Sequence, residues 1–265
     1  MKLPERFINE SLARHWQVDE TEESFERLMY HLEHKTNFKP YFEESINKLC
    51  FDSDKFKDGI IVADVGAGVC WTSAMLANHP SVKHVYAVDP SEQRLKHAES
   101  VLKHFKVPED KVTLINGTFD KPNIPEKVDL VLLCGALHHC YDEDIPALFS
   151  NIKNLLTEEG MVLVANEHYV TPSWLVIRFL SFIKNFRRLK ERGLSFTALR
   201  APDQFGGEHW RIRKELEHIF SSCGFKANFF IHEGDLCKDK PRFYQRFGWK
   251  YYHAFLENIT PCDIL

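Results

Sequence analysis

The sequence predicts an α/β fold built on a doubly wound, mostly parallel sheet. Short runs of branched apolar residues alternate along the chain with stretches long enough for helices, and turns containing glycine or acidic residues follow several of these runs. Such alternation is typical of a sheet covered by helices on both faces. With 265 residues and 44% apolar content, the chain can bury the core of one domain, although its length alone would allow two.

The first predicted strand covers residues 60–65, where β-branched and apolar residues form an almost unbroken run. Asp64 lies near its end. Gly66 and Gly68 follow directly, and glycines in such a turn let the backbone approach a ligand closely. A helix over 69–78 should come next. This order of strand, glycine turn and helix predicts a cofactor pocket.

The second and third predicted strands, 84–89 and 111–116, also end in residues suited to a ligand. Asp89 can accept hydrogen bonds from both hydroxyls of a ribose, so it favours a nucleoside pocket. The alternative is a solvated aspartate that caps the predicted helix over 91–105. The third strand leads into Gly117, Thr118, Phe119 and Asp120.

The fourth predicted strand, 128–134, leads into a pair of neighbouring histidines, His138 and His139. A helix over 144–156 and an apolar run over 155–164 should form the next helix and the fifth strand. In open α/β sheets, ligands gather outside the carboxyl ends of the strands. The histidine pair is therefore expected to lie near the ligand. The alternative is a turn that packs under the next helix without touching substrate.

These segments together resemble the class I S-adenosylmethionine-dependent methyltransferases. Residues 64–68, Asp-Val-Gly-Ala-Gly, are similar to the D-x-G-x-G motif of that family. The D-L-V-x5-L-H-H-x-x-D stretch over 129–142 and the L-L-T-E-E-G-M-V-L-V stretch over 155–164 look like the fourth and fifth strands of its small-molecule members. The likeness covers about residues 59–232 in the right order. It implies a seven-stranded Rossmann-like sheet, S-adenosylmethionine as the methyl donor and S-adenosylhomocysteine as product.

The resemblance also implies which residues bind the cofactor. At position 118 the family usually carries an acid that binds the adenine amino group. This chain has Thr118, so Asp120 or backbone atoms would take that role, with Phe119 against the adenine face. Trp71 occupies the place of the third glycine in the dinucleotide fingerprint, which argues against NAD. The implied cofactor-binding residues are Asp64, Gly66, Ala67, Gly68, Asp89, Pro90, Gly117, Thr118, Phe119, Cys134 and Gly135.

Methyl transfer requires the acceptor to be held close to the methyl carbon and in line with it. A hydroxyl or ammonium acceptor must also lose a proton, so a general base is expected. His138 and His139 are the candidates, since imidazole titrates near neutrality. In the resembling enzymes the first histidine of such a pair is the base, and an acid at the end of the fifth strand orients it. Asn166 stands at the matching position, so the charge would have to come from Glu167. The predicted acceptor-binding residues are His168, His209 and Arg211.

Two additions flank the predicted sheet. Residues 1–58 should form two helices that cap the cofactor or simply pack on the sheet, ahead of a cofactor-binding half over 59–168. Within 169–208, a basic amphipathic helix over 173–192 should act as a lid whose Arg187 and Arg188 meet an anionic acceptor. A membrane or partner contact and a packed helix with a solvated basic face are the alternatives. Residues 209–265 should supply the last helix and strands.

Composition narrows the possible partners. A net charge of −4 and a pI near 6.4 make nucleic acid an unexpected partner. No apolar run is long enough for a membrane span, and no signal peptide is evident. Seven cysteines without a C-x-x-C pair indicate reduced thiols and a cytoplasmic protein. The protein is expected to be a monomer or a homodimer, and the sequence does not distinguish these two states. No metal is expected, because no four-ligand spacing occurs.

The sequence thus predicts an enzyme that methylates O or N of a small polar acceptor, such as a phosphorylated or sugar-containing metabolite from glycan or natural-product assembly. Two other hypotheses remain. The chain could bind S-adenosylmethionine and act as a membrane- or partner-associated module through its basic helix. It could instead be an NAD-dependent oxidoreductase.

Overall fold

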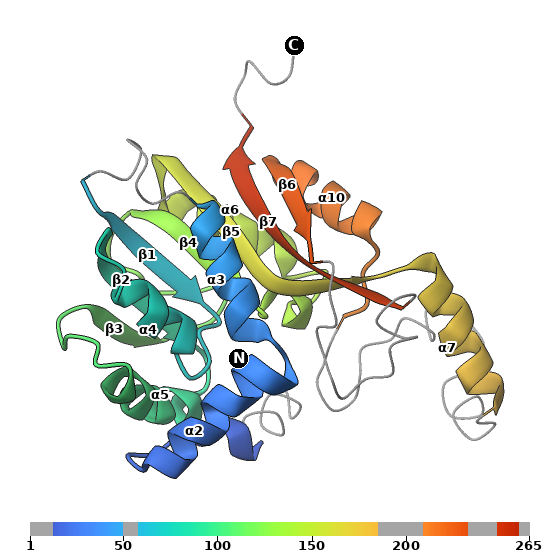
Figure 1. The fold of residues 1–265 in the computed structure, drawn as a ribbon. Coiled ribbons are helices and arrows are strands. Elements are labelled where there is room, and N and C mark those ends of the chain that lie inside the picture. The colour runs from blue at the N-terminus through green and yellow to red at the C-terminus, as the bar shows by residue number, and fades with distance from the viewer. Residues whose placement is uncertain (1–12, 50–57, 185–208, 233–247, 260–265) are drawn as a thin grey trace.

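The computed structural model contains one seven-stranded sheet, in the order β3-β2-β1-β4-β5-β7-β6 (Figure 1). All neighbouring strands are parallel except those paired with β7, which runs antiparallel to β5 and β6. The predicted doubly wound, mostly parallel seven-stranded sheet is confirmed. The strands are β1 (Ile60–Val65), β2 (Val82–Asp89), β3 (Val112–Asn116), β4 (Val128–Cys134), β5 (Leu156–Val170), β6 (Phe225–Ile231) and β7 (Trp249–Asn258). The structure describes residues 13–49, 58–184, 209–232 and 248–259.

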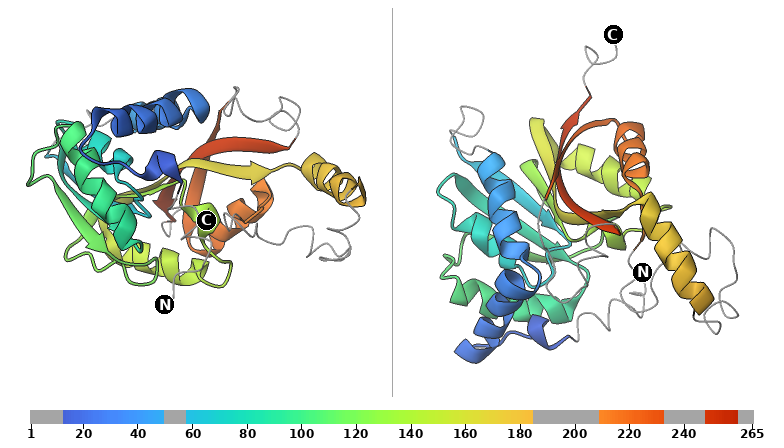
Figure 2. Two further views of the ribbon diagram at one scale, coloured as in Figure 1. Left: turned by 90° about the horizontal axis from the view of Figure 1, so that it is seen from below. Right: turned by 45° about the vertical axis from the view of Figure 1, so that its right-hand side comes forward.

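Helices cover both faces of the sheet, as Figure 2 shows. Alternate residues of each central strand belong to two separate apolar clusters: Ile60 and Val62 of β1 lie in one, and Ala63 and Val65 in the other. The first cluster receives side chains from α2, α3, α4 and α5, and the second from α6 and α10. The helices are α2 (Glu22–Tyr30), α3 (Phe38–Lys48), α4 (Trp71–Ala77), α5 (Glu92–His104), α6 (Ile145–Leu155), α7 (Pro172–Lys184) and α10 (Arg213–Ser222).

Within its described residues, 13–49, the N-terminal segment contains α2 and α3, where two helices are expected from the apolar periodicity. Thr21 caps α2, because its hydroxyl accepts a hydrogen bond from the backbone N–H of Ser24. A π-helical turn, η2 (His31–Lys35), joins α2 to α3. Phe42 of α3 is fully buried and its ring packs edge-on against Trp71, at 5.3 Å between centroids. The bulky residue that follows the glycine turn therefore forms part of the contact between α3 and α4.

Strand β5 is longer than the predicted run over 155–164 and contains a β-bulge. Its pairing with β7 matches Val164 to Ala254 and then Glu167 to Tyr252, so β5 has one residue more than its partner over this interval. Asn166 adopts φ of 51°, a left-handed conformation that asparagine tolerates better than most residues. The bulge changes which face of the sheet the following residues meet.

Helix α7 leaves the end of β5 and projects away from the sheet (Figure 1). Trp174 anchors its first turn in a small buried cluster with Val170 and Trp210. Farther along, Val176 and Leu180 are exposed. The predicted helix over 173–192 is seen as far as residue 184, and its remainder lies outside the described residues. Among the residues described, no helix combines the length and apolar character needed to span a bilayer.

Candidate active site

A pocket opens at the carboxyl ends of β1, β2, β3 and β4, where the sequence places its cofactor-binding residues. Its volume is about 340 Å³, within the range of small-molecule sites. Gly66 illustrates how the turn makes this space: it has φ of +84°, and a Cβ there would lie 2.7 Å from the Cβ of Ala136. The predicted residues that line the pocket are Gly66, Asp89, Pro90, Gly117, Thr118, Phe119, Gly135 and His139.

Asp64 is buried at the base of the glycine turn. The hydroxyls of Thr72 and Ser73 donate to its Oδ2 at 2.7 and 2.6 Å, whereas its Oδ1 has no hydrogen-bond partner within the described structure. Burial raises the pKa of Asp64 to about 6; the two hydroxyls oppose this shift, and nearby Asp89 adds to it. A buried carboxylate oxygen without a partner is suited to an ammonium group, so the residues present fit the amino acid end of the cofactor.

Asp89 is held in place by the backbone. Its Oδ2 accepts a hydrogen bond from the N–H of Gly68 at 2.9 Å, and its Oδ1 accepts one from Ser91 at 2.8 Å. Each carboxylate oxygen can accept further bonds, and Asp89 lines the pocket, so it can also accept from a ribose. The hydroxyl of Ser91 accepts from Arg94 and caps α5. The structure thus gives the capping role to Ser91.

The segment after β3 forms another wall of the pocket. The hydroxyl of Thr118 donates to Oδ1 of Asp120 at 2.6 Å, which fixes that carboxylate and holds its pKa below the usual value. Asn151 donates to the carbonyls of Phe119 and Asp120 and ties the segment to α6. All three residues of this segment line the pocket. Asp120 and the Phe119 ring are therefore available for the adenine contacts predicted for them.

Glu167, beyond the bulge, forms a pair with His138. Its Oε2 lies 2.9 Å from Nδ1 of His138, and its Oε1 accepts from the backbone N–H of Leu137 at 2.6 Å. Burial would raise the pKa of Glu167, but the charge and hydrogen bond of His138, with smaller contributions from His168 and the Leu137 amide, hold that pKa below its usual value. An ionised, buried glutamate thus orients the imidazole that begins the histidine pair.

The side chain of Asn166 makes other contacts than the bond to His138 that the family pattern suggests. Its side-chain amide donates to the backbone carbonyl of Phe38 at 2.9 Å and to Sγ of Cys134 at 3.4 Å. These contacts join β5 to α3 and β4. Glu167 makes the hydrogen bond to His138, and Asn166 instead holds the start of α3 against the sheet.

The other predicted acceptor residues surround the histidine pair. The rings of His139 and His168 lie 4.0 and 5.0 Å from that of His138, measured between centroids. His209 contacts the same segment through its backbone N–H, which donates to the carbonyl of His138 at 2.9 Å. Four histidines from three parts of the chain therefore lie around the end of β4.

Arg211 is buried against the segment that carries the histidines. Its guanidinium donates to Oδ1 of Asp142 at 2.8 Å and to the carbonyls of Leu137 and Cys140 at 3.2 and 2.6 Å. This arrangement makes Arg211 a positioning residue, and its predicted contact with the acceptor stays a prediction. Arg187 and Arg188 lie outside the described residues.

Two residues of this region were missed in the sequence. Arg178 of α7 lies over the rings of Trp174 and Trp210, at 4.7 and 5.4 Å from their centroids. Tyr252 of β7 pairs with Glu167 across the sheet, and its pKa is raised, first by burial and then by the charge of Glu167. The concentration of basic residues in this helix indicated that Arg178 could have a role. Nothing local in the sequence shows that Tyr252 pairs with Glu167.

The match to a protein-family model agrees with this geometry. The model describes a methyltransferase domain and matches residues 62–160, from the first strand to the start of the fifth. An uncharacterised methyltransferase of Bacillus cytotoxicus is 24% identical over 165 residues, which cover 62% of this chain and 68% of that protein.

Solved structures share the fold. The magnesium protoporphyrin IX methyltransferase of Synechocystis, solved with S-adenosylhomocysteine, has a TM-score of 0.57 at 17% identity and covers 94% of this chain and 93% of its own. The 1,6-didemethyltoxoflavin-N1-methyltransferase of Burkholderia thailandensis has a TM-score of 0.56 at 13% identity, covering 90% and 85%. With the family match and the glycine-turn pocket, these likenesses agree with the resemblance seen in the sequence: residues 62–160 match a methyltransferase domain, and the chain shares the fold of solved methyltransferases.

Proposed function

We propose that this methyltransferase acts on an oxygen or nitrogen atom of a small polar metabolite and that His138 is its general base. The observation that carries the proposal is the hydrogen bond of 2.9 Å between Nδ1 of His138 and the buried, ionised Glu167. This bond leaves Nε2 as the ring nitrogen that can accept a proton. The carboxylate then stabilises the imidazolium that forms.

Cofactor binding follows from the carboxylates already described. Asp64 would hold the ammonium group of S-adenosylmethionine, Asp89 the ribose hydroxyls, and Phe119 with Asp120 the adenine. When bound, the cofactor supplies an electrophilic methyl group. The chain's own contribution is to hold the acceptor in line with that methyl carbon and remove the acceptor's proton, and positioning alone can provide much of the acceleration.

A small acceptor is supported by the solved neighbours, whose names give magnesium protoporphyrin IX and 1,6-didemethyltoxoflavin as substrates. For this chain we favour a metabolite that carries negative charge, such as a phosphorylated or sugar-linked compound, because basic residues are concentrated over 178–200. Charge reversal at Arg187 and Arg188 should then raise the KM for the acceptor and leave S-adenosylhomocysteine binding unchanged. A screen with labelled methyl donor against matched phosphorylated and unphosphorylated metabolites would identify the class, and a clear preference for neutral acceptors would contradict it.

The base is tested by comparing His138→Ala with His139→Ala once an acceptor is known. Loss of a general base should lower kcat by about 10²- to 10⁴-fold. His138→Ala should show this loss while the Kd for S-adenosylhomocysteine, measured by calorimetry, stays near that of the wild type. His139→Ala should retain most of the turnover. If the two variants exchange these behaviours, His139 is the base.

Glu167→Gln provides a second test, because it keeps the size of the side chain and removes its charge. We expect turnover to fall through lost stabilisation of the His138 imidazolium, with a smaller effect on cofactor affinity. Thermal unfolding of the variant controls for damage to the bonds with the Leu137 segment. Unchanged turnover in a folded Glu167→Gln protein would remove the pair from the mechanism.

A further inference from the structure

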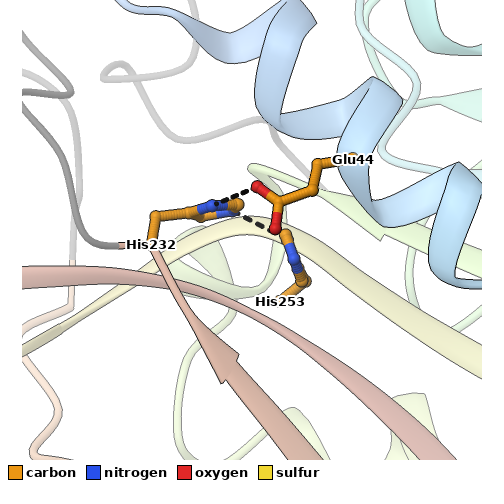
Figure 3. Close-up of side chains that lie close together, drawn as sticks. All are labelled: Glu44, His232 and His253. Atoms are coloured by element: carbon orange, nitrogen blue, oxygen red, sulfur yellow. Dashed lines mark hydrogen bonds and ion pairs between the residues drawn. The ribbon is translucent and has the colours of Figure 1, made fainter.

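A second group of potential ligands lies among α3, β6 and β7 (Figure 3). It contains Glu44 from α3, His232 directly after β6, and His253 from β7. Nδ1 of His232 is 3.1 Å from Oε2 of Glu44, and its Nε2 is 2.8 Å from Nδ1 of His253. One ligand atom from each residue can be chosen so that all three lie within 4.8 Å of one another.

Burial sets the two imidazoles apart from ordinary surface histidines. His253 has no exposed surface and His232 is 6% exposed. Nε2 of His253 is buried without a hydrogen-bond partner among the described residues. Buried polar nitrogens are nearly always satisfied, so the hydrogen bonding of this ring is incomplete; Nδ1, on the other side of the ring, is the nitrogen that faces His232.

The donor set has a specific chemical preference. Two imidazole nitrogens and one carboxylate oxygen are the ligands of many three-residue zinc sites, which leave a fourth position for water. Magnesium and calcium prefer oxygen donors instead.

We propose that Glu44, His232 and His253 bind a divalent transition-metal ion of the zinc type. Ligands around a tetrahedral zinc ion lie about 3.3 Å apart, given Zn–N and Zn–O distances of about 2.0 to 2.1 Å. Nε2 of His232 and Nδ1 of His253 are slightly closer, at 2.8 Å, so the ion takes the place of the hydrogen bond between the imidazoles as the rings open by about half an ångström. Glu44 now contacts the other nitrogen of His232, Nδ1, and has to turn from it to reach the ion. The carboxylate of Glu44 is 48% exposed and can rotate toward the ion.

Neighbouring groups permit this change. Nζ of Lys48 lies 3.5 Å from the carboxylate of Glu44 and would compete with the metal, but the lysine side chain is 35% exposed and can move into solvent. The ring of Tyr41, also on α3, lies 3.9 Å from that of His232 and covers it on one side. These groups leave the carboxylate as the ligand with most freedom to adjust.

A bound ion would connect the N-terminal helix α3 to the β6–β7 edge of the sheet. It would thereby stabilise the docking of α3, whose Phe38 carbonyl accepts the hydrogen bond from Asn166 at the bulge. The expected effect is on the stability of this contact, and it does not depend on the identity of the methyl acceptor.

The test uses the full chain treated with a chelator and then titrated with Zn²⁺, with Mg²⁺ as the control ion. We expect one Zn²⁺ per chain at this site, a higher Tm in its presence, and visible absorption from Co²⁺ bound in its place. Glu44→Gln should weaken Zn²⁺ binding at least about 10-fold, because even residues that only hydrogen-bond to metal ligands contribute about 10- to 100-fold. Glu43→Gln is the matched control, since this neighbour on α3 is exposed to a similar extent and pairs with Lys39.

Two further variants test whether the ion binds at this group, and circular dichroism tests whether the altered protein folds. His232→Ala should abolish the Zn²⁺-dependent rise in Tm, and its circular dichroism reports whether it folds. His138→Ala should retain that rise, because His138, Glu167 and His168 form the other group with suitable spacing. The proposal is overturned if wild type binds no Zn²⁺, if Glu44→Gln binds it as tightly as Glu43→Gln, or if His138→Ala is the variant that loses the ion.

Discussion

If Asp64 holds the ammonium group of the cofactor, as we propose, its raised pKa should make cofactor affinity depend on pH. In the free protein this carboxyl titrates at about pH 6, so it is ionised above that value and protonated below it. An ammonium group bound at Oδ1 requires the ionised form. Affinity for S-adenosylhomocysteine should therefore be fully present at pH 7.5 and should decrease as the pH falls through 6.

The magnitude follows from the fraction ionised. At pH 5 a carboxyl with a pKa of about 6 is ionised in about one molecule in eleven, compared with nearly all molecules at pH 7.5. If binding requires that charge, the Kd should rise about tenfold between these two values, equivalent to about 1.4 kcal/mol. Asp64→Asn should weaken binding at pH 7.5 and remove most of the pH dependence.

Calorimetric titration at pH 5, 6 and 7.5 measures this effect. 5′-Methylthioadenosine is the matched control ligand, because it keeps adenine and ribose and lacks the amino acid. Its Kd should stay nearly constant over the same range. A tenfold loss shared by both nucleosides would place the titrating group at the ribose or adenine, and a constant Kd for S-adenosylhomocysteine would refute the contact with Asp64.

Three further substitutions test the surrounding structure. Asp89→Ala should weaken S-adenosylhomocysteine and 5′-methylthioadenosine alike, by about 10- to 100-fold for lost charge-assisted hydrogen bonds; equal affinity in variant and wild type would mean that Asp89 does not hold the ribose. Arg211→Ala removes the guanidinium bonds to the buried Cys140 carbonyl and to Asp142 and one of two hydrogen bonds to the Leu137 carbonyl, so the free energy of unfolding in urea should fall by about 1 to 3 kcal/mol. Gly66→Ala places a methyl group against Ala136 at a positive φ, which should cost about 1 to 3 kcal/mol and reduce cofactor binding; a fully stable variant would contradict the close packing of the turn.

The central strands were predictable because burial on both faces leaves a continuous apolar run. The first and fourth predicted strands, 60–65 and 128–134, agree with β1 and β4 at both ends. The glycine turn and the acid at the end of β2 were predictable for a related reason, since their residue types report backbone conformation and charge directly. These local signals account for most of the predicted pocket.

The pairing of His138 with Glu167 was less predictable because it depends on strand pairing. The family pattern assigns the orienting residue to Asn166, and the extra residue in β5 gives the contact to Glu167. A bulge is a property of two strands together, and β7, the partner, lies about 90 residues farther along the chain. The group of Glu44, His232 and His253 was not predicted for the same reason, since its members come from three distant segments.

The bulge also determines which face of the sheet each later side chain of β5 meets. Before it, odd-numbered residues such as Ala165 belong to the apolar cluster on the α3 face, and after it the odd-numbered Tyr169 belongs to the cluster on the opposite face. Deleting one residue here would therefore move each following side chain, as far as Val170, to the opposite face of the sheet. A substitution in this strand changes one side chain and its neighbours. A deletion near Asn166 changes the facing of several side chains, so a compensating insertion before α7 would be needed to restore it.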